Sequence, residues 1–212
     1  MTGATARVRP AVAYQGVAGA FSELALDRLW GGRVEGRPCV TFDEVVATVL
    51  EGAVPLGLLP VENSIAGPVQ ASVAAIAGSG LEVLGSTAMT ITLCLLAPPG
   101  ATIQSVTIAE SHPVALRQCS VFLGAHPLIE PRVSGDTAGA AAAVAASGDR
   151  SRGAIASSRA GALYGLTTLA EGIEDRSDNT TRFVIIGARG ARSLFRALED
   201  ERRSASLGRC TS

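Results

Sequence analysis

The residues of this chain best suited to catalysis or ligand binding are Thr181, Arg182 and Phe183, which precede the apolar run 184–186. A hydroxyl, a guanidinium and an aromatic ring therefore meet where a loop becomes a strand. Because side chains alternate along a strand, we expect Thr181 and Phe183 on one face and Arg182 on the other. Threonine is also common in sheets for packing reasons alone, so the triplet needs support from the rest of the chain.

Asn63 and Ser64 follow the apolar run 55–59, which predicts a buried strand. Their side chains should emerge at the end of this strand, where they could contact a ligand or only cap a turn. Glu62 is better suited to fixing this loop or pairing with an arginine than to facing an anion, because like charges repel.

Ser22, Thr137 and His112 lie near predicted helix N-termini, where unpaired N–H groups and the helix dipole favour anions. Ser22 is expected to cap the helix that follows it, and Thr137 adjoins the cap residue Asp136. Either hydroxyl could add a hydrogen bond to a ligand. His112 could make activity depend on pH, or it could only hold its own loop.

The composition excludes several kinds of catalyst. All 18 basic residues are arginine, so Schiff-base chemistry, pyridoxal phosphate and a Walker-type phosphate loop are excluded, because each needs a lysine. Only two histidines are present and neither forms a ligand pair with a carboxylate, so we expect no metal and no cofactor. The formal charge of −1, with scattered arginines, gives no nucleic-acid footprint.

The cysteines and the apolar runs indicate the compartment. Cys39, Cys94, Cys119 and Cys210 lie far apart, so they are predicted to be buried or incidental thiols. No apolar run reaches the ~18 residues of a membrane span. The N-terminus lacks the apolar core of a signal peptide. We therefore expect a cytoplasmic protein with a small-molecule ligand and no membrane partner.

Short apolar runs alternate with helical segments, which is typical of an α/β architecture with mainly parallel sheets. Strands are expected at about 11–14, 55–59, 106–109, 128–133, 153–156 and 181–187, and helices after Ser22, Thr41, Pro113 (to about 123) and Asp136. Thr41 is expected to cap its helix, because residues 41–44 form a capping box. The stretch 81–97 is too long for one ordinary strand. It is predicted to cross between two lobes, and the chain is expected to return through 166–173.

Four segments in the same order resemble the catalytic domain of prephenate dehydratases and plant-type arogenate dehydratases. They are the glycine loop 13–23, the Glu-Asn-Ser segment 60–69, Ser111-His112-Pro113 with Gln118-Cys119, and the run from 162–173 to Thr181-Arg182-Phe183. The resemblance covers about residues 11–188. It implies a two-lobed fold of the type II periplasmic-binding-protein kind, with the active site in the interlobe cleft.

The resemblance also implies a domain organisation. We expect a catalytic domain over residues 8–190, with lobe 1 at about 8–88 and 168–190 and lobe 2 at about 89–167. Residues 191–212 are expected to form a C-terminal tail, as strand or helix. They are too few for the regulatory ACT domain that family members usually carry after the catalytic part. Because the family associates, we expect a homodimer.

Prephenate carries two carboxylates and a ring hydroxyl, and losing CO2 together with this hydroxyl makes the ring aromatic. By resemblance, Thr181 donates to the leaving hydroxyl, and Arg182 and Phe183 shape the catalytic site. A threonine hydroxyl is a very weak acid, so it should act as a positioned donor or proton relay. The residues expected to bind substrate are Ser22, Asn63, Ser64, Gly67, His112 and Thr137. At the His112 loop, Val114 stands where the family usually has glutamine.

The leading expectation is dehydration of prephenate to phenylpyruvate in L-phenylalanine biosynthesis. Arogenate, which would give phenylalanine directly, is the close alternative, because segments 14–16 and 169–173 look plant-like. A non-aromatising prephenate decarboxylase is less expected, since such relatives lack the threonine donor and the Glu-Asn-Ser motif. A non-catalytic solute-binding protein on the same fold is the alternative from another functional class.

Overall fold

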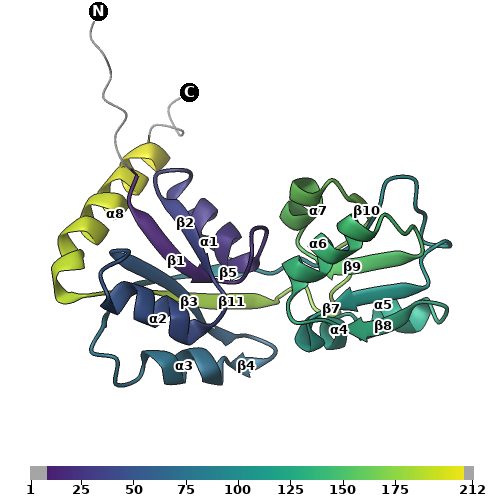
Figure 1. The fold of residues 1–212 in the computed structure, drawn as a ribbon, viewed down its shortest axis with the longest axis horizontal. Coiled ribbons are helices and arrows are strands. Elements are labelled where there is room, and N and C mark those ends of the chain that lie inside the picture. Colours follow the sequence, from purple (N-terminus) through teal and green to yellow (C-terminus); the bar gives the residue numbers. More distant parts are fainter. Residues whose placement is uncertain (1–8, 208–212) are drawn as a thin grey trace, which may run out of the picture.

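A computed structural model describes residues 9–207 and shows two α/β lobes side by side (Figure 1). The chain begins in lobe 1, on the left of Figure 1, crosses to lobe 2 and then returns. Each lobe has its own sheet with helices on both faces. The predicted two-lobed α/β fold is therefore confirmed.

Lobe 1 contains most of the chain's length. Its elements are β1 (Ala11–Gln15), α1 (Phe21–Trp30), β2 (Glu35–Cys39), α2 (Phe42–Leu50), β3 (Leu56–Asn63), β4 (Gly67–Pro68), α3 (Gln70–Ile76), β5 (Glu82–Thr90), β11 (Thr180–Gly187), a 3-10 turn (Arg189–Ala191) and α8 (Arg192–Leu207). The strand order is β2-β1-β3-β11-β5, with β4 paired to β3.

Lobe 2 lies between the two crossings. Its elements are β6 (Cys94–Ala97), β7 (Ile108–Ser111), α4 (Pro113–Gln118), α5 (Ser120–Ala125), β8 (Glu130–Val133), α6 (Thr137–Ser147), β9 (Arg152–Ala156), α7 (Ser158–Tyr164) and β10 (Thr167–Glu171). The strand order is β10-β6-β9-β7-β8. Because β10 pairs with β6, the chain returns to lobe 1 after Glu171, later than the expected residue 168.

The strand directions are more mixed than the mainly parallel sheets expected from the sequence. Strand β1 is parallel to β2 and β3, and β7 is parallel to β8 and β9. The crossing strands run against their neighbours: β11 is antiparallel to β3 and β5, and β6 is antiparallel to β9 and β10. A strand that enters a lobe from the other lobe starts at the edge where β1, β3, β7 and β9 end, so it must run in the opposite direction.

The sheet of lobe 1 is covered on both faces, and its strands divide their side chains between two apolar clusters. The face toward α1 buries Phe183 and Ile185, and the face toward α2 buries Val184 and Ile186. This alternation confirms the period of two expected for the last strand. Because Thr181 lies two residues before Phe183, its side chain points to the α1 face.

Two helix caps predicted from the sequence are confirmed. Thr41 Oγ1 accepts from the Glu44 N–H at 3.1 Å, and Asp136 Oδ1 accepts from the Gly139 N–H at 2.6 Å. The cap predicted at Ser22 is wrong, because α1 already begins at Phe21 and Ser22 lies buried in its first turn.

The single helix predicted at 113–123 is divided into α4 and α5 at Cys119. The carbonyl of Gln118 accepts from the Asp175 N–H at 2.6 Å, so its hydrogen bond is made with the segment that returns to lobe 1. The Asp175 carboxylate accepts from the Ser120 and Val121 N–H groups at 3.1 and 2.9 Å and so caps the second helix. A contact distant in sequence therefore breaks a helix that is locally favourable.

The cysteines are buried as predicted where the structure describes them. Cys39, Cys94 and Cys119 are buried free thiols, and Cys210 lies outside the described residues. Burial raises the pKa of Cys94 to about 11 and that of Cys119 to about 12, so both thiols stay protonated. Within residues 9–207, no helix has the length and apolar character needed to cross a membrane.

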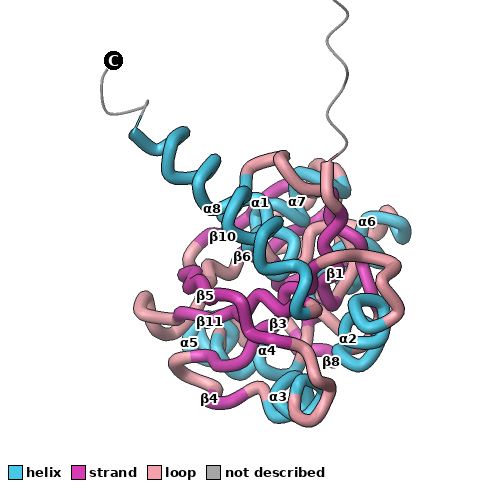
Figure 2. Tube along the Cα trace, turned by 90° about the vertical axis from the view of Figure 1, so that its left-hand side faces the viewer, coloured by secondary structure: helices cyan, strands magenta, loops and turns pink. Residues whose placement is uncertain are grey.

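The segment after residue 191 forms helix α8, which lies beside α1 on lobe 1 (Figure 2). Phe195 makes an edge-on contact with Trp30 at a ring-centroid distance of 6.4 Å. Trp30 Nε1 donates to Glu199 Oε1 at 3.2 Å, and Leu198 is buried. Up to Leu207, the expected tail is therefore a packed part of lobe 1.

We expect Phe195→Ala to lower the free energy of unfolding by about 2 kcal/mol, less than a fully buried aromatic would lose, because Phe195 is half-buried. Urea unfolding followed by circular dichroism measures the change. Leu128→Ala is the matched control, because the Leu128 side chain is 83% exposed. Equal stability of the two variants would show that α8 contributes no packing energy.

Candidate active site between the lobes

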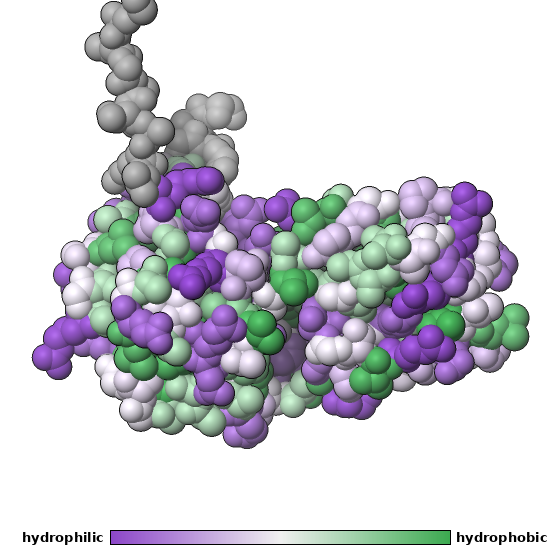
Figure 3. All heavy atoms as spheres, in the orientation of Figure 1, coloured by the Kyte–Doolittle hydropathy of each residue, from purple (hydrophilic) through white to green (hydrophobic). Residues whose placement is uncertain are grey.

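The carboxyl ends of the parallel strands in the two lobes face each other. In lobe 1, β1 leads into the loop 16–20 and β3 ends at Asn63; in lobe 2, β9 leads into Ser157. Ser157 Oγ donates to the Gly19 carbonyl across the lobes at 3.0 Å. Open α/β sheets generally bind ligands at these edges. Figure 3 shows a narrow hollow where the lobes meet.

Thr181 and Asn63 are brought together at this boundary by the pairing of β11 with β3, which places them directly opposite each other. Asn63 Nδ2 donates to Thr181 Oγ1 at 3.0 Å. Thr181 is 9% exposed, and no described residue accepts the proton of its hydroxyl. Thr181 therefore receives one hydrogen bond from the protein and keeps its own proton for a ligand.

The orientation of the Asn63 amide is fixed by its surroundings. Its Oδ1 accepts from the N–H groups of Ile65 and Ala66 at 3.1 and 2.8 Å. These donors require an oxygen at that position, so the NH2 group must face Thr181. The turn after β3 thus determines which kind of hydrogen bond Thr181 receives.

Gln118 of lobe 2 joins the same group of amides. Its Nε2 donates to Asn63 Oδ1 at 3.2 Å, and its Oε1 accepts from Asn179 Nδ2 at 3.2 Å. Asn63 Nδ2 also donates to Asn179 Oδ1 at 2.8 Å. We call Asn63, Gln118 and Asn179 the amide cluster. Neither Gln118 nor Asn179 was expected at the site from the sequence, although both lie within the quoted motifs or directly beside them.

Arg182 and Phe183 do not lie beside the Thr181 hydroxyl, and their catalytic role stays a prediction. Arg182 projects from the opposite face of β11, is exposed, and pairs with Glu62 at 3.0 Å. The expectation that Glu62 pairs with an arginine is thereby confirmed. Phe183 is 1% exposed and belongs wholly to the core. Because side chains alternate along β11, Arg182 lies on the face opposite Thr181. The Phe183 side chain packs against α1.

Ser64 and Gly67 shape the turn after β3. Ser64 Oγ donates to the Asp178 carbonyl and accepts from the Thr180 N–H, both at 2.9 Å. Its hydroxyl is therefore used in holding the start of β11, as the turn-capping alternative predicts. Gly67 pairs opposite Asn63 with φ +81°, a conformation that favours glycine. Ser64 thus fixes the backbone next to Thr181, and Gly67 fixes the backbone at Asn63.

His112 holds its own loop. It is the N-cap of α4, and its Nδ1 accepts from the Val114 N–H at 3.2 Å. Burial, and then the nearby charge of Arg117, lowers the pKa of His112, so the imidazole is neutral near pH 7. A neutral ring suits its role as a hydrogen-bond acceptor.

Ser22 and Thr137 keep unused hydroxyls. Ser22 lies in the first turn of α1 and is 6% exposed; Thr137 is the first residue of α6 and half-buried. Neither hydroxyl has a hydrogen-bond partner among residues 9–207. Both remain candidates for ligand binding beside helix N-termini.

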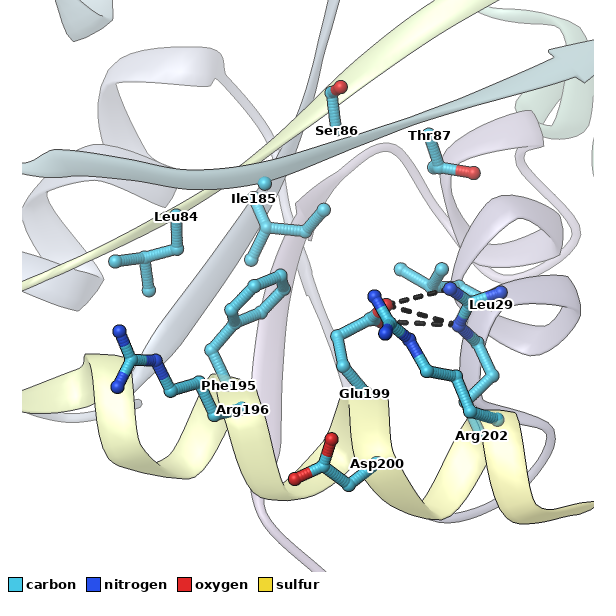
Figure 4. A pocket seen from close by; sticks show the side chains of 12 residues that line it. Leu29, Leu84, Ser86, Thr87, Ile185, Phe195, Arg196, Glu199, Asp200 and Arg202 are labelled. Carbon is cyan, nitrogen blue, oxygen red and sulfur yellow. Dashed lines mark hydrogen bonds and ion pairs between the residues drawn. The ribbon is translucent and has the colours of Figure 1, made fainter.

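A second hollow of about 340 Å³ lies away from the cleft, between β5, α1 and α8 (Figure 4). It is lined by Leu84, Ile185 and Phe195 on the apolar side and by a Glu199–Arg202 pair at 2.7 Å. It contains none of the predicted site residues. No group of three or more potential metal ligands is found in the described part of the chain.

Comparison with known proteins gives one consistent match. The family model for prephenate dehydratase matches residues 12–191. Arogenate dehydratase 1 of Petunia hybrida is 40% identical over 88% of this chain and 43% of that protein. A bifunctional N-acyl-homoserine lactone acylase/prephenate dehydratase of Komagataeibacter europaeus is 38% identical over 85% of this chain and 63% of that protein.

The fold matches as well. The structure of prephenate dehydratase from Arthrobacter aurescens in complex with L-Phe superposes with a TM-score of 0.78 at 28% identity, over 84% of this chain and 60% of that chain. The chain spans about half the length of most curated relatives it matches.

Proposed function

Because the chain belongs to the prephenate dehydratase family, we propose that it converts prephenate to phenylpyruvate by decarboxylating dehydration, in L-phenylalanine biosynthesis. The observation that carries the proposal is the Thr181 hydroxyl, which accepts from Asn63 and keeps its own proton at the interlobe boundary. We propose that residues 8–190 form the catalytic domain, and helix α8 packs on lobe 1 beside α1.

The reaction needs a donor at the leaving oxygen. As the ring carboxylate departs as CO2, the electrons of its C–C bond enter the ring and the C–O bond breaks, so negative charge builds on the departing hydroxyl. Thr181 donates a hydrogen bond to this oxygen, and the bond strengthens as the charge grows. The departing oxygen leaves as water after taking a proton from solvent through the Thr181 hydroxyl.

Asn63 makes Thr181 a better donor. A hydroxyl that accepts a hydrogen bond is polarised, and its own proton becomes a stronger donor in a site of low dielectric. The Asn63 bond also fixes the direction in which the proton can point. The N-termini of α1 and α6 supply N–H groups for the substrate carboxylates, since both helices follow strands that end at the cleft.

Arogenate is the alternative substrate. It carries an amino group where prephenate has a keto group, and relatives that act on either substrate match this chain. The proposed donation from Thr181 to the leaving oxygen does not involve that position, so the same chemistry serves both substrates. We expect prephenate to be preferred.

Purified protein should form phenylpyruvate from prephenate, measured by absorbance in alkali, and should form phenylalanine from arogenate more slowly. Loss of CO2 without an aromatic product would indicate the decarboxylase alternative. Binding of either compound without turnover would indicate a solute-binding protein. Absence of both binding and turnover would contradict the proposal altogether.

We further propose that the protein acts as a homodimer in the cytoplasm, with a small molecule as its ligand and without nucleic-acid or membrane partners. The homodimer was expected from the family alone. Light scattering on the purified protein gives the molar mass, and a monomer at assay concentration would contradict the homodimer.

A further inference from the structure

Parts of two motif segments quoted from the sequence meet across the lobes, at residues to which the proposed chemistry assigns no role. One is the glycine loop at 16–20, which follows β1 in lobe 1. The other is the end of α7 at Tyr164, in lobe 2. Their contact lies at a second place along the interlobe boundary, separate from the amide cluster.

Both ends of α7 hold the glycine loop. Tyr164 Oη donates to the Ala18 carbonyl at 2.7 Å, and Ser157 Oγ donates to the Gly19 carbonyl at 3.0 Å. Ser157 is also the N-cap of α7, because its Oγ accepts from the Ala160 N–H at 3.1 Å. Two successive carbonyls of lobe 1 are thus bound by one short helix of lobe 2.

The loop is built to fit against this helix. Gly19 has φ +88°, and a Cβ at this position would lie 3.0 Å from Ala160 Cα and 3.1 Å from Ala160 Cβ. On the other side, the Gly19 N–H donates to Glu23 Oε2 at 2.6 Å. The peptide at Gly19 is therefore held by α1 of its own lobe and by α7 of the other lobe. Only glycine allows both contacts.

We infer that Ser157 and Tyr164 are positioning residues that latch the glycine loop to α7 and hold the two lobes closed around the substrate. This inference rests on the proposed function. A ring dianion must enter between the lobes, so bonds that join the two lobes must open for entry and form again for turnover. Burial raises the pKa of Tyr164, so its phenol remains a donor at neutral pH.

The expected effect follows from the population of the closed form. If the latch stabilises the closed form, losing one neutral hydrogen bond lowers the closed fraction, and apparent affinity falls by the same factor. One such bond corresponds to a factor of roughly 3–10. Chemistry in the closed form is unchanged, because neither residue contacts the reacting atoms.

Tyr164→Phe should therefore raise KM for prephenate roughly 3–10-fold and leave kcat within about twofold. Small-angle scattering of the ligand-free variant should give a larger radius of gyration than the wild type, and saturating substrate should restore it. Tyr14→Phe is the matched control, because the Tyr14 hydroxyl has no hydrogen-bond partner in the described residues. It should change neither KM nor the radius of gyration.

An unchanged KM and radius of gyration in Tyr164→Phe would overturn the latch. A fall in kcat with constant KM would also overturn it, because Tyr164 would then act in the chemical step. If wild-type protein turned over neither prephenate nor arogenate, the proposed function would fail. The scattering comparison of the ligand-free proteins would still decide whether the latch exists.

Discussion

Thr181→Val should lower kcat for prephenate roughly 10²–10³-fold, the usual effect of losing one donor to a developing oxyanion. Valine keeps the β-branched shape of threonine at a position that is 9% exposed, so strand geometry should be kept. KM should change little, because the lost bond matters mainly in the transition state. Steady-state kinetics with prephenate measures both values.

Thr181→Ser is the matched control, because it removes a methyl group and keeps the hydroxyl that Asn63 binds. It should retain kcat within about tenfold, since only packing is altered. If valine and serine variants were equally active, the hydroxyl would have no part in the chemical step.

Asn63→Asp should lower kcat roughly 10²-fold by reversing the hydrogen bond to Thr181. The new carboxylate can still accept from the Ile65 and Ala66 N–H groups, so the turn is kept. Toward Thr181, however, it presents an acceptor where the amide presented a donor. The Thr181 hydroxyl then donates its hydrogen bond to the carboxylate and can no longer donate it to the substrate.

The readout is again kcat at saturating prephenate. KM should also rise in Asn63→Asp, because the added charge repels a dianion, so kcat/KM alone would mix two effects. Ser64→Ala serves as a control in the same turn, since Ser64 Oγ contacts only backbone groups at the start of β11. Its kcat should fall much less. A normal kcat for Asn63→Asp would mean that Asn63 does not orient Thr181.

Features set by local sequence were predictable. The alternation at 181–186 follows from side-chain periodicity, and the caps at Thr41 and Asp136 follow from hydrogen bonds within a few residues. The crossing at 81–97 follows from the length of a stretch that exceeds one ordinary strand. The motif order also placed Thr181 and Asn63 in one cleft, although they are 118 residues apart.

Features set by distant contacts could not be predicted. Asp175 divides the helix at 113–123 because its backbone and carboxylate replace local partners. Which arginine pairs with Glu62 depends on the pairing of β11 with β3, which places Arg182 opposite Glu62. Gln118 contacts Asn63 from the other lobe, although the two residues are 55 positions apart in the sequence. In each case the residue type is known from the sequence, but its hydrogen-bond or ion-pair partner is known only once the fold brings distant segments together.

The most direct test is the kcat of the double variant Asn63→Asp/Thr181→Val, compared with the two single variants. If Asn63 acts by directing the Thr181 proton, the hydroxyl in Asn63→Asp no longer donates to the substrate. Removing this hydroxyl should then lower kcat little further. We therefore predict a double variant about as slow as the slower single variant. If the two losses multiplied, the residues would act independently, and the account of a single directed hydroxyl would be contradicted.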